Sequence, residues 1–256
     1  MHPFDEGFEP PEDCVLWCRN RTHDLHVLDD GALVDLDWWN THLKAGGHEI
    51  RLRGRDLDGR VVDGGKTTIL RNDLRPGSEL AIGGHPNLGL LFLCAAWQGS
   101  HHSRQARRRF PDVRNGRLPK DVDPLATIEA VLDFCAKQKR IPDAPDSSWS
   151  GWPDTPGVGV VLLSTYLWAV GARTAAGPAQ LIDQHGISTL LHQGWIENPA
   201  VTGFTVRRYN RYLGVLNAWA EQAETCPELV ERWLVERWTA RVHEARTGQR
   251  AEPTLF

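Results

Sequence analysis

The sequence has no long hydrophobic run, and no N-terminal segment joins a basic region to an apolar stretch. A membrane-spanning helix needs roughly 20 consecutive apolar residues, so we expect a cytoplasmic protein with no membrane partner. Internal repeats and low-complexity blocks are also absent. What remains is typical of a globular chain that buries a core, with 256 residues, 41% of them hydrophobic and 24% charged.

Cysteines are few, odd in number and scattered, at Cys14, Cys18, Cys94, Cys135 and Cys226. This pattern argues against a disulfide framework and predicts reduced thiols. Cys14, Cys18, His23 and His26 lie close together in the sequence, but zinc ligand pairs are usually separated by a longer loop. We therefore expect no metal site there, and no iron–sulfur cluster near the C-terminus, where Cys226 is the only cysteine.

Excess positive charge is lacking too, because the formal net charge is −4. The whole protein is therefore not attracted to nucleic acid, and any DNA binding must come from a local basic patch. Residues 100–117 are rich in arginine, and helical spacing would place Arg104, Arg107 and Arg108 on one face. From charge alone, a solvated helix face is the alternative interpretation.

Apolar periodicity predicts a mostly α-helical protein. A capping aspartate before a proline, Asp123-Pro124, marks one helix start, and a capping box at 225–228 marks another. Helices are expected at 33–43, 88–97, 124–139, 157–171, 181–194 and 205–224, and from 225 onward.

Three regions are expected along the chain. Residues 1–85 form an irregular or β-containing N-terminal region, with an extended tail over the first 12 residues and a β-prone piece at 66–70. Residues 86–246 form a helical domain, interrupted by a linker at 141–155 that is rich in Pro, Ser and Asp. Residues 247–256 form a polar tail.

The most informative stretch is Pro-Gly-Val-Gly at 156–159, directly before an apolar helix. Two glycines two residues apart allow a tight turn that exposes backbone amides, and the positive end of the following helix lies in the same place. Such a surface suits a phosphate. The alternative is a simple turn before a helix.

Further candidates lie around this stretch. Asp183 opens the next helix, where a carboxylate is also a favoured N-cap worth roughly 1 kcal/mol, so capping alone is an alternative to catalysis. His185 could face the same pocket or the helix surface. Trp149 and Trp152, in the linker, are candidates for stacking on a base, or they simply pin the linker down.

The hairpin at 156–159, the buried helix and Asp183 together resemble the helix-hairpin-helix DNA glycosylases, especially the 8-oxoguanine glycosylase type and its bacterial versions. The resemblance covers roughly 86–240 and implies that fold, with a small N-terminal region added. It implies that Gly157, Val158 and Gly159 grip a phosphate of double-stranded DNA, with a monovalent cation possible at the hairpin carbonyls. It also implies that Asp183 is the catalytic carboxylate.

Two features depart from that family. Val161 stands where bifunctional members carry a lysine, and no lysine follows Lys139. The loop before Asp183, residues 173–180, is also longer than usual. The expected function is monofunctional removal of a damaged or modified base. The alternatives are a DNA-binding relative without chemistry, for example in bacterial defence, or a helical protein-interaction module; the sequence identifies no protein partner.

Overall fold

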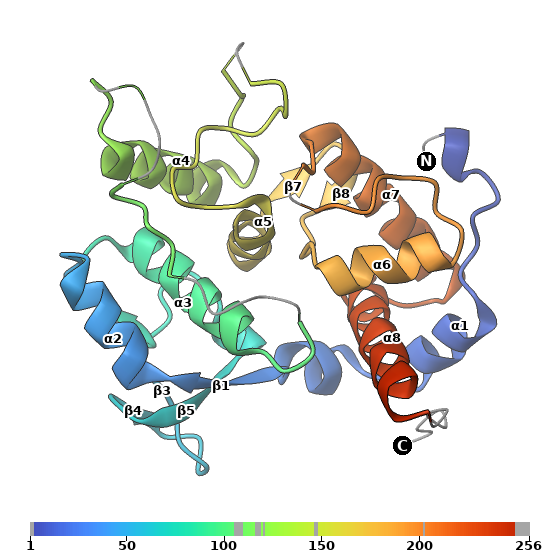
Figure 1. Cartoon of the computed structure of the whole chain (residues 1–256), viewed down its shortest axis with the longest axis horizontal. Coiled ribbons are helices and arrows are strands. Elements are labelled where there is room, and N and C mark those ends of the chain that lie inside the picture. Colours follow the sequence, from blue (N-terminus) through green and yellow to red (C-terminus); the bar gives the residue numbers. More distant parts are fainter. Residues whose placement is uncertain are drawn as a thin grey trace.

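The computed structural model describes residues 3–104, 110–115, 119, 121–145, 148–201 and 203–248. Helices dominate it, with a small sheet in the N-terminal region, which confirms the predicted mostly α-helical fold. None of the helices in these ranges is both long and apolar enough to cross a membrane. In Figure 1 the sheet, α2, α3 and α4 lie on one side, α6, α7, α8 and α1 on the other, and α5 lies between.

The N-terminal region contains more regular structure than expected. Its helices are η1 (Pro3–Asp5), α1 (Glu12–Arg19), η2 (Asp24–Leu28), α2 (Leu36–Ala45) and η3 (Arg71–Asp73). Its strands are β1 (Gly31–Asp35), β2 (Arg51–Leu52), β3 (Gly54–Arg55), β4 (Val61–Val62), β5 (Lys66–Leu70) and β6 (Ala81–Ile82). One sheet has the order β1-β5-β3-β4, and β2 pairs with β6.

Strand β1 corrects the predicted helix at 33–43. It pairs antiparallel with β5, Gly31 opposite Leu70, and buries Ala32 and Val34 on alternate positions. The helix begins only at Leu36, because the Asp35 side chain accepts a hydrogen bond from the Trp38 amide and caps α2. Pairing with a distant strand, which local periodicity does not report, overrides the helical pattern here.

The extended tail predicted for the first 12 residues is wrong. Asp5 is buried, where it pairs with Arg211 (2.6 Å) and accepts a hydrogen bond from the Trp195 indole (3.0 Å). The Trp219 indole donates to the Phe8 carbonyl (2.8 Å). Residues 3–8 are therefore packed against the C-terminal helices (Figure 1).

The remaining helices follow the predicted order, with one short hairpin added. The elements are α3 (Pro86–Ser100), α4 (Pro124–Gln138), α5 (Val160–Ala169), β7 (Arg173–Thr174), β8 (Gly177–Pro178), α6 (Gln184–His192), α7 (Val206–Gln222) and α8 (Pro227–Thr247). Helix α3 is buried over Leu88–Gln98 and contacts β1, α4 and α5. Helix α6 packs against α8.

The capping box predicted at 225–228 does not form. Pro227 is the first residue of α8, so Cys226 occupies the N-cap position, without a side-chain capping bond. The Thr225 amide instead donates to the Ala220 carbonyl (2.9 Å) and closes the end of α7. The start of α8 therefore lies one residue later than the sequence pattern suggested.

Candidate active site

A tight turn leads into the N-terminus of α5. The Val158 amide donates to the Thr155 carbonyl (3.0 Å), and the Thr155 hydroxyl donates to the Val158 carbonyl (3.1 Å). Gly157 has φ +73°, while Gly159 is extended and is the N-cap of α5. The first amides of α5 have no partner within the helix, so this end of α5 can accept an anion.

Gly157 is required by its surroundings as well as by its φ angle. A Cβ atom there would lie 2.5 Å from the carbonyl carbon of Asp112 and 2.8 Å from the amide nitrogen of Val113. Gly159 differs, because a Cβ there would meet nothing within 4 Å. The turn thus lies against the Asp112–Val113 backbone on one side and is open at Gly159.

We expect Gly157→Ala to lower the free energy of unfolding by about 1–3 kcal/mol, because it combines an unfavourable φ with a backbone clash. Gly159→Ala is the matched control, since its φ of −82° and open surroundings tolerate a methyl group. Urea denaturation of both variants measures the difference. Equal stabilities would show that the turn is not held against residues 112 and 113.

Asp183 caps α6 and is held from two sides. Its carboxylate accepts a hydrogen bond from the His185 amide (2.8 Å), and the residue is only 2% exposed. The Ser164 hydroxyl, on α5, accepts from the Ile182 amide (2.9 Å). The Tyr209 hydroxyl, on α7, accepts from the Gln180 amide (3.0 Å) and donates to the Gln180 carbonyl (2.7 Å). The segment before Asp183 is therefore fixed to both neighbouring helices.

The environment of Asp183 shifts its ionisation. Burial raises the pKa of the Asp183 carboxyl above its ordinary value of 3.8, and the positive charge of Arg104 and the His185 amide oppose this rise. Glu231 adds to the rise through its negative charge. A buried carboxyl with a raised pKa beside a fixed cation is a common arrangement at catalytic sites.

Arg104 is not on the predicted basic surface. It is 4% exposed and pairs in a bidentate manner with Glu231, with Nη1–Oε1 at 2.7 Å and Nη2–Oε2 at 3.1 Å. Arg71 Nη1 also reaches Glu231 Oε2 (3.1 Å), and its guanidinium lies 4.3 Å from the centre of the Trp168 ring. A buried carboxylate therefore holds two arginines, which removes Arg104 from any direct role at the surface.

A second buried charge cluster adjoins this one. Asp30 accepts a hydrogen bond from His101 Nε2 (2.7 Å), and its other oxygen lies 3.2 Å from Arg232 Nη1. The Ser103 amide donates to His101 Nδ1, so the ring is neutral with its proton on Nε2. Burial lowers the pKa of His101 to about 4, which agrees with this assignment.

The segment that carries Arg104 contacts the start of α6. His185 Nδ1 donates to the Ser103 carbonyl (2.9 Å), which also accepts from the Thr239 hydroxyl (3.1 Å). His185 is half-buried by this contact. The structure thus brings together Asp183, His185 and Arg104, although Arg104 was predicted elsewhere.

Trp152 and Trp149, the two tryptophans proposed as base-pocket residues, differ in exposure. Trp152 is 5% exposed, donates from its indole to the Phe204 carbonyl (2.6 Å) and packs on Tyr209, so it pins the linker. Trp149 is 80% exposed. Arg107 and Arg108 lie outside the described residues.

Two cavities open elsewhere on the molecule. One, of about 810 Å³, lies beside α7 and the β7–β8 hairpin, and the other, of about 200 Å³, is lined by His48, His85 and Arg114 among others. Asp183 lines neither of them. Its carboxylate lies beneath the surface, at the junction of α5, α6 and the Arg104 segment.

Two buried charged residues near this site were not predicted from the sequence: Glu231, whose charge acts on Asp183, and Arg71, which pairs with Glu231. Glu231 is a charged residue within the apolar face of α8, between Val230 and Trp233, and this is the one signal that marked it as a buried partner. Arg71 gave no comparable signal, because its partner lies 160 positions away.

Comparison with known proteins adds one match. A family model described as "Putative 8-oxoguanine DNA glycosylase OGG-like protein" matches residues 25–235. No curated protein and no solved structure matches the chain. The match begins within η2 and ends within α8, so it includes all strands from β1 to β8 and the helices from α2 to α7.

Proposed function

Since the chain belongs to the OGG-like 8-oxoguanine DNA glycosylase family, we propose that it is a monofunctional DNA glycosylase with Asp183 as its catalytic carboxylate. The observation that carries this proposal is the buried Asp183 at the N-terminus of α6, with its pKa raised by burial and Arg104 as a neighbouring cation. The substrate is a damaged or modified base in DNA, and the product is an abasic site.

The chemistry requires only hydrolysis. The C1′–N bond breaks with its electron pair moving to the base, while the oxygen of a water molecule forms a bond to C1′. The transition state carries positive charge on the sugar, which a carboxylate stabilises, and the same carboxylate accepts the proton that water loses. Val161 provides no amine at the corresponding position of α5, so no Schiff base is part of this proposal.

DNA is held, in this proposal, by the turn at Gly157, Val158 and Gly159 and by the first amides of α5, which together suit one phosphate. A monovalent cation fits this turn, because the Thr155 and Val158 carbonyls each accept one hydrogen bond and retain a second lone pair. Such a cation would neutralise part of the phosphate charge. Arg107, Arg108 and the exposed Trp149 remain proposed DNA contacts, with duplex DNA as the partner.

We expect the rate of base release to fall on the acid side at a pH above 3.8, the ordinary pKa of an aspartate. The carboxyl is active as the anion, and burial raises its pKa, so protonation inactivates it earlier as the pH falls. Arg104→Gln removes a cation that lowers the pKa of Asp183, so in this variant the rate should begin to fall at a higher pH. If the rate of the wild type falls only near pH 3.8, Asp183 is solvated.

A second candidate is a DNA-binding protein that has lost the chemistry. The near-complete enclosure of Asp183 and its role as the N-cap of α6 favour it. In this case a base would not reach the carboxylate, and the wild type and Asp183→Asn would bind DNA equally well without cleaving it. Binding should still weaken steeply with salt, because phosphate contacts release counterions.

The two candidates are separated by incubating the protein with duplex and single-stranded oligonucleotides that carry 8-oxoguanine, uracil, alkylated bases or no modification. Alkali then cleaves the strand wherever a base has been released. Cleavage of one modified substrate supports the glycosylase and identifies its base. Binding without cleavage of any substrate supports the second candidate, and failure to bind DNA contradicts both.

A further inference from the structure

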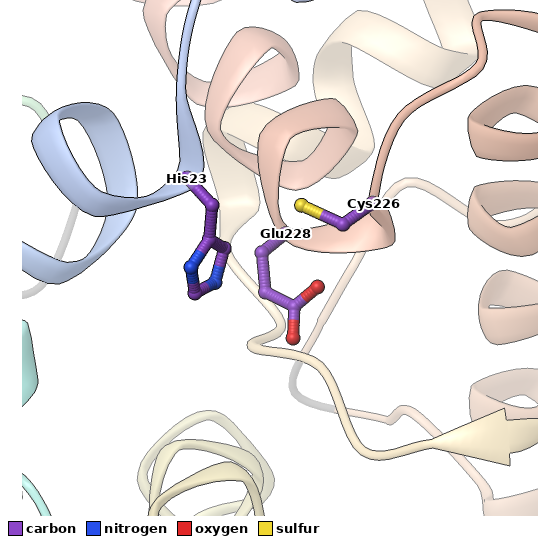
Figure 2. A group of neighbouring side chains, drawn as sticks. All are labelled: His23, Cys226 and Glu228. Carbon is purple, nitrogen blue, oxygen red and sulfur yellow. The ribbon is translucent and has the colours of Figure 1, made fainter.

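Three side chains with metal-ligating atoms meet far from Asp183, where the N-terminal segment contacts the start of α8. They are His23, directly before η2, and Cys226 and Glu228, at the N-cap and in the first turn of α8 (Figure 2). One ligand atom from each lies within 4.8 Å of the other two. His23 is separated from the other two by about 200 positions in the sequence, so the fold alone brings them together.

We propose that His23, Cys226 and Glu228 form a zinc site that fastens the N-terminal segment to α8. A thiolate, an imidazole and a carboxylate are all established zinc ligands. The three ligand atoms lie within 4.8 Å of one another, so rotation of the side chains has only to bring them slightly closer for one ion to bind at about 2.0–2.3 Å from each.

The state of each side chain fits this role. Cys226 is partly exposed, whereas the other four cysteines are buried, so it is the thiol that an ion can reach. Although Cys226 is the N-cap residue, its side chain makes no capping hydrogen bond. His23 and Glu228 are also partly exposed.

The coordination has one further position. The carboxylate of Asp24 lies 3.7 Å from His23 Nδ1, where it can orient the imidazole. Water takes the remaining position, as in zinc sites with three protein ligands.

The surrounding contacts define what the ion would do. Helix α1 and η2 both pack against α8, and Arg237 lies 3.4 Å from Asp13 on α1. The ion would link the N-terminal segment to the start of α8 at this contact. Asp30, which pairs with His101 in the buried charge cluster, closely follows η2. The zinc site would therefore fix the position of η2, which leads into that cluster.

The test uses the 256-residue chain, which is freed of metal with a chelator, kept reduced and titrated with Co²⁺ as a spectroscopic substitute for Zn²⁺. We expect one Co²⁺ per chain, a thiolate-to-cobalt charge-transfer band, and displacement of that band by Zn²⁺. Saturating Zn²⁺ should raise the Tm by about 5 °C or more, because it binds only the folded chain.

Variants of the three ligands decide whether this site is responsible. Cys226→Ser should abolish the band while keeping a favoured N-cap residue, so the fold is preserved. His23→Gln and Glu228→Gln should weaken binding at least about 10-fold, a loss that even outer-shell changes can cause. His243→Gln, on α8, is the control and should bind as the wild type does. Absence of the band in the wild type, or its persistence in Cys226→Ser or unchanged affinity in His23→Gln, would overturn the proposal.

Discussion

Glu231→Ala is expected to lower the free energy of unfolding by about 3–5 kcal/mol at neutral pH, because it leaves two buried guanidinium groups without their carboxylate. Glu231 receives both Arg104 and Arg71 at distances of 2.7–3.1 Å. Neither arginine is exposed to water that could replace the lost partner. Urea denaturation at neutral pH measures the effect.

Glu236→Ala is the matched control on the same helix. Its ion pair with Arg232 (3.0 Å) is partly exposed, so its loss should cost less than about 1 kcal/mol. Similar losses in the two variants would contradict the view that Glu231 holds a buried network together.

The loss in Glu231→Ala should itself depend on pH. Burial alone would raise the pKa of Glu231, but Arg104 and Arg71 bring it below the ordinary value of 4.5. A carboxyl group of this kind stabilises the fold above its unfolded pKa and loses that contribution as the pH falls through its folded pKa. The difference between wild type and Glu231→Ala should therefore shrink below about pH 4.5.

Asp183→Asn is expected to reduce the rate of base release by roughly 10²–10⁴-fold, the range typical for a lost general base or a lost charge that stabilises the transition state. The fold should change little, since asparagine is as good an N-cap as aspartate and can accept the same hydrogen bond from the His185 amide. A catalytic role therefore separates cleanly from the capping role. DNA affinity should stay close to that of the wild type.

Elements with local signals could be predicted from the sequence. The start of α4 follows from Asp123-Pro124. The Asp123 carboxylate accepts a hydrogen bond from the Leu125 amide (2.9 Å), as expected of an N-cap. The tight turn before α5 follows from Gly157, since glycine is the residue that most readily adopts the positive φ found there. In each case residues a few positions apart determine the geometry, so a single sequence contains the information.

Elements that depend on distant partners could not be predicted. β1 forms because β5 lies beside it, although the local pattern favours a helix. Arg104 is buried because Glu231 lies 127 positions later, while its neighbours in the sequence suggested a surface patch. The placement of Asp183 at a helix start was predictable, but its burial and the nearby charges of Arg104 and Glu231 were not.

The most direct test of the proposed function compares Asp183→Asn with Asp123→Asn on the oligonucleotide that the wild type cleaves. Asp123 is an exposed N-cap on α4, so its replacement makes the same chemical change at a capping carboxylate away from the candidate active site. We predict that alkali-labile sites form at the wild-type rate with Asp123→Asn and at least about 100-fold more slowly with Asp183→Asn. Equal rates in the two variants would contradict the assignment of Asp183 as the catalytic carboxylate.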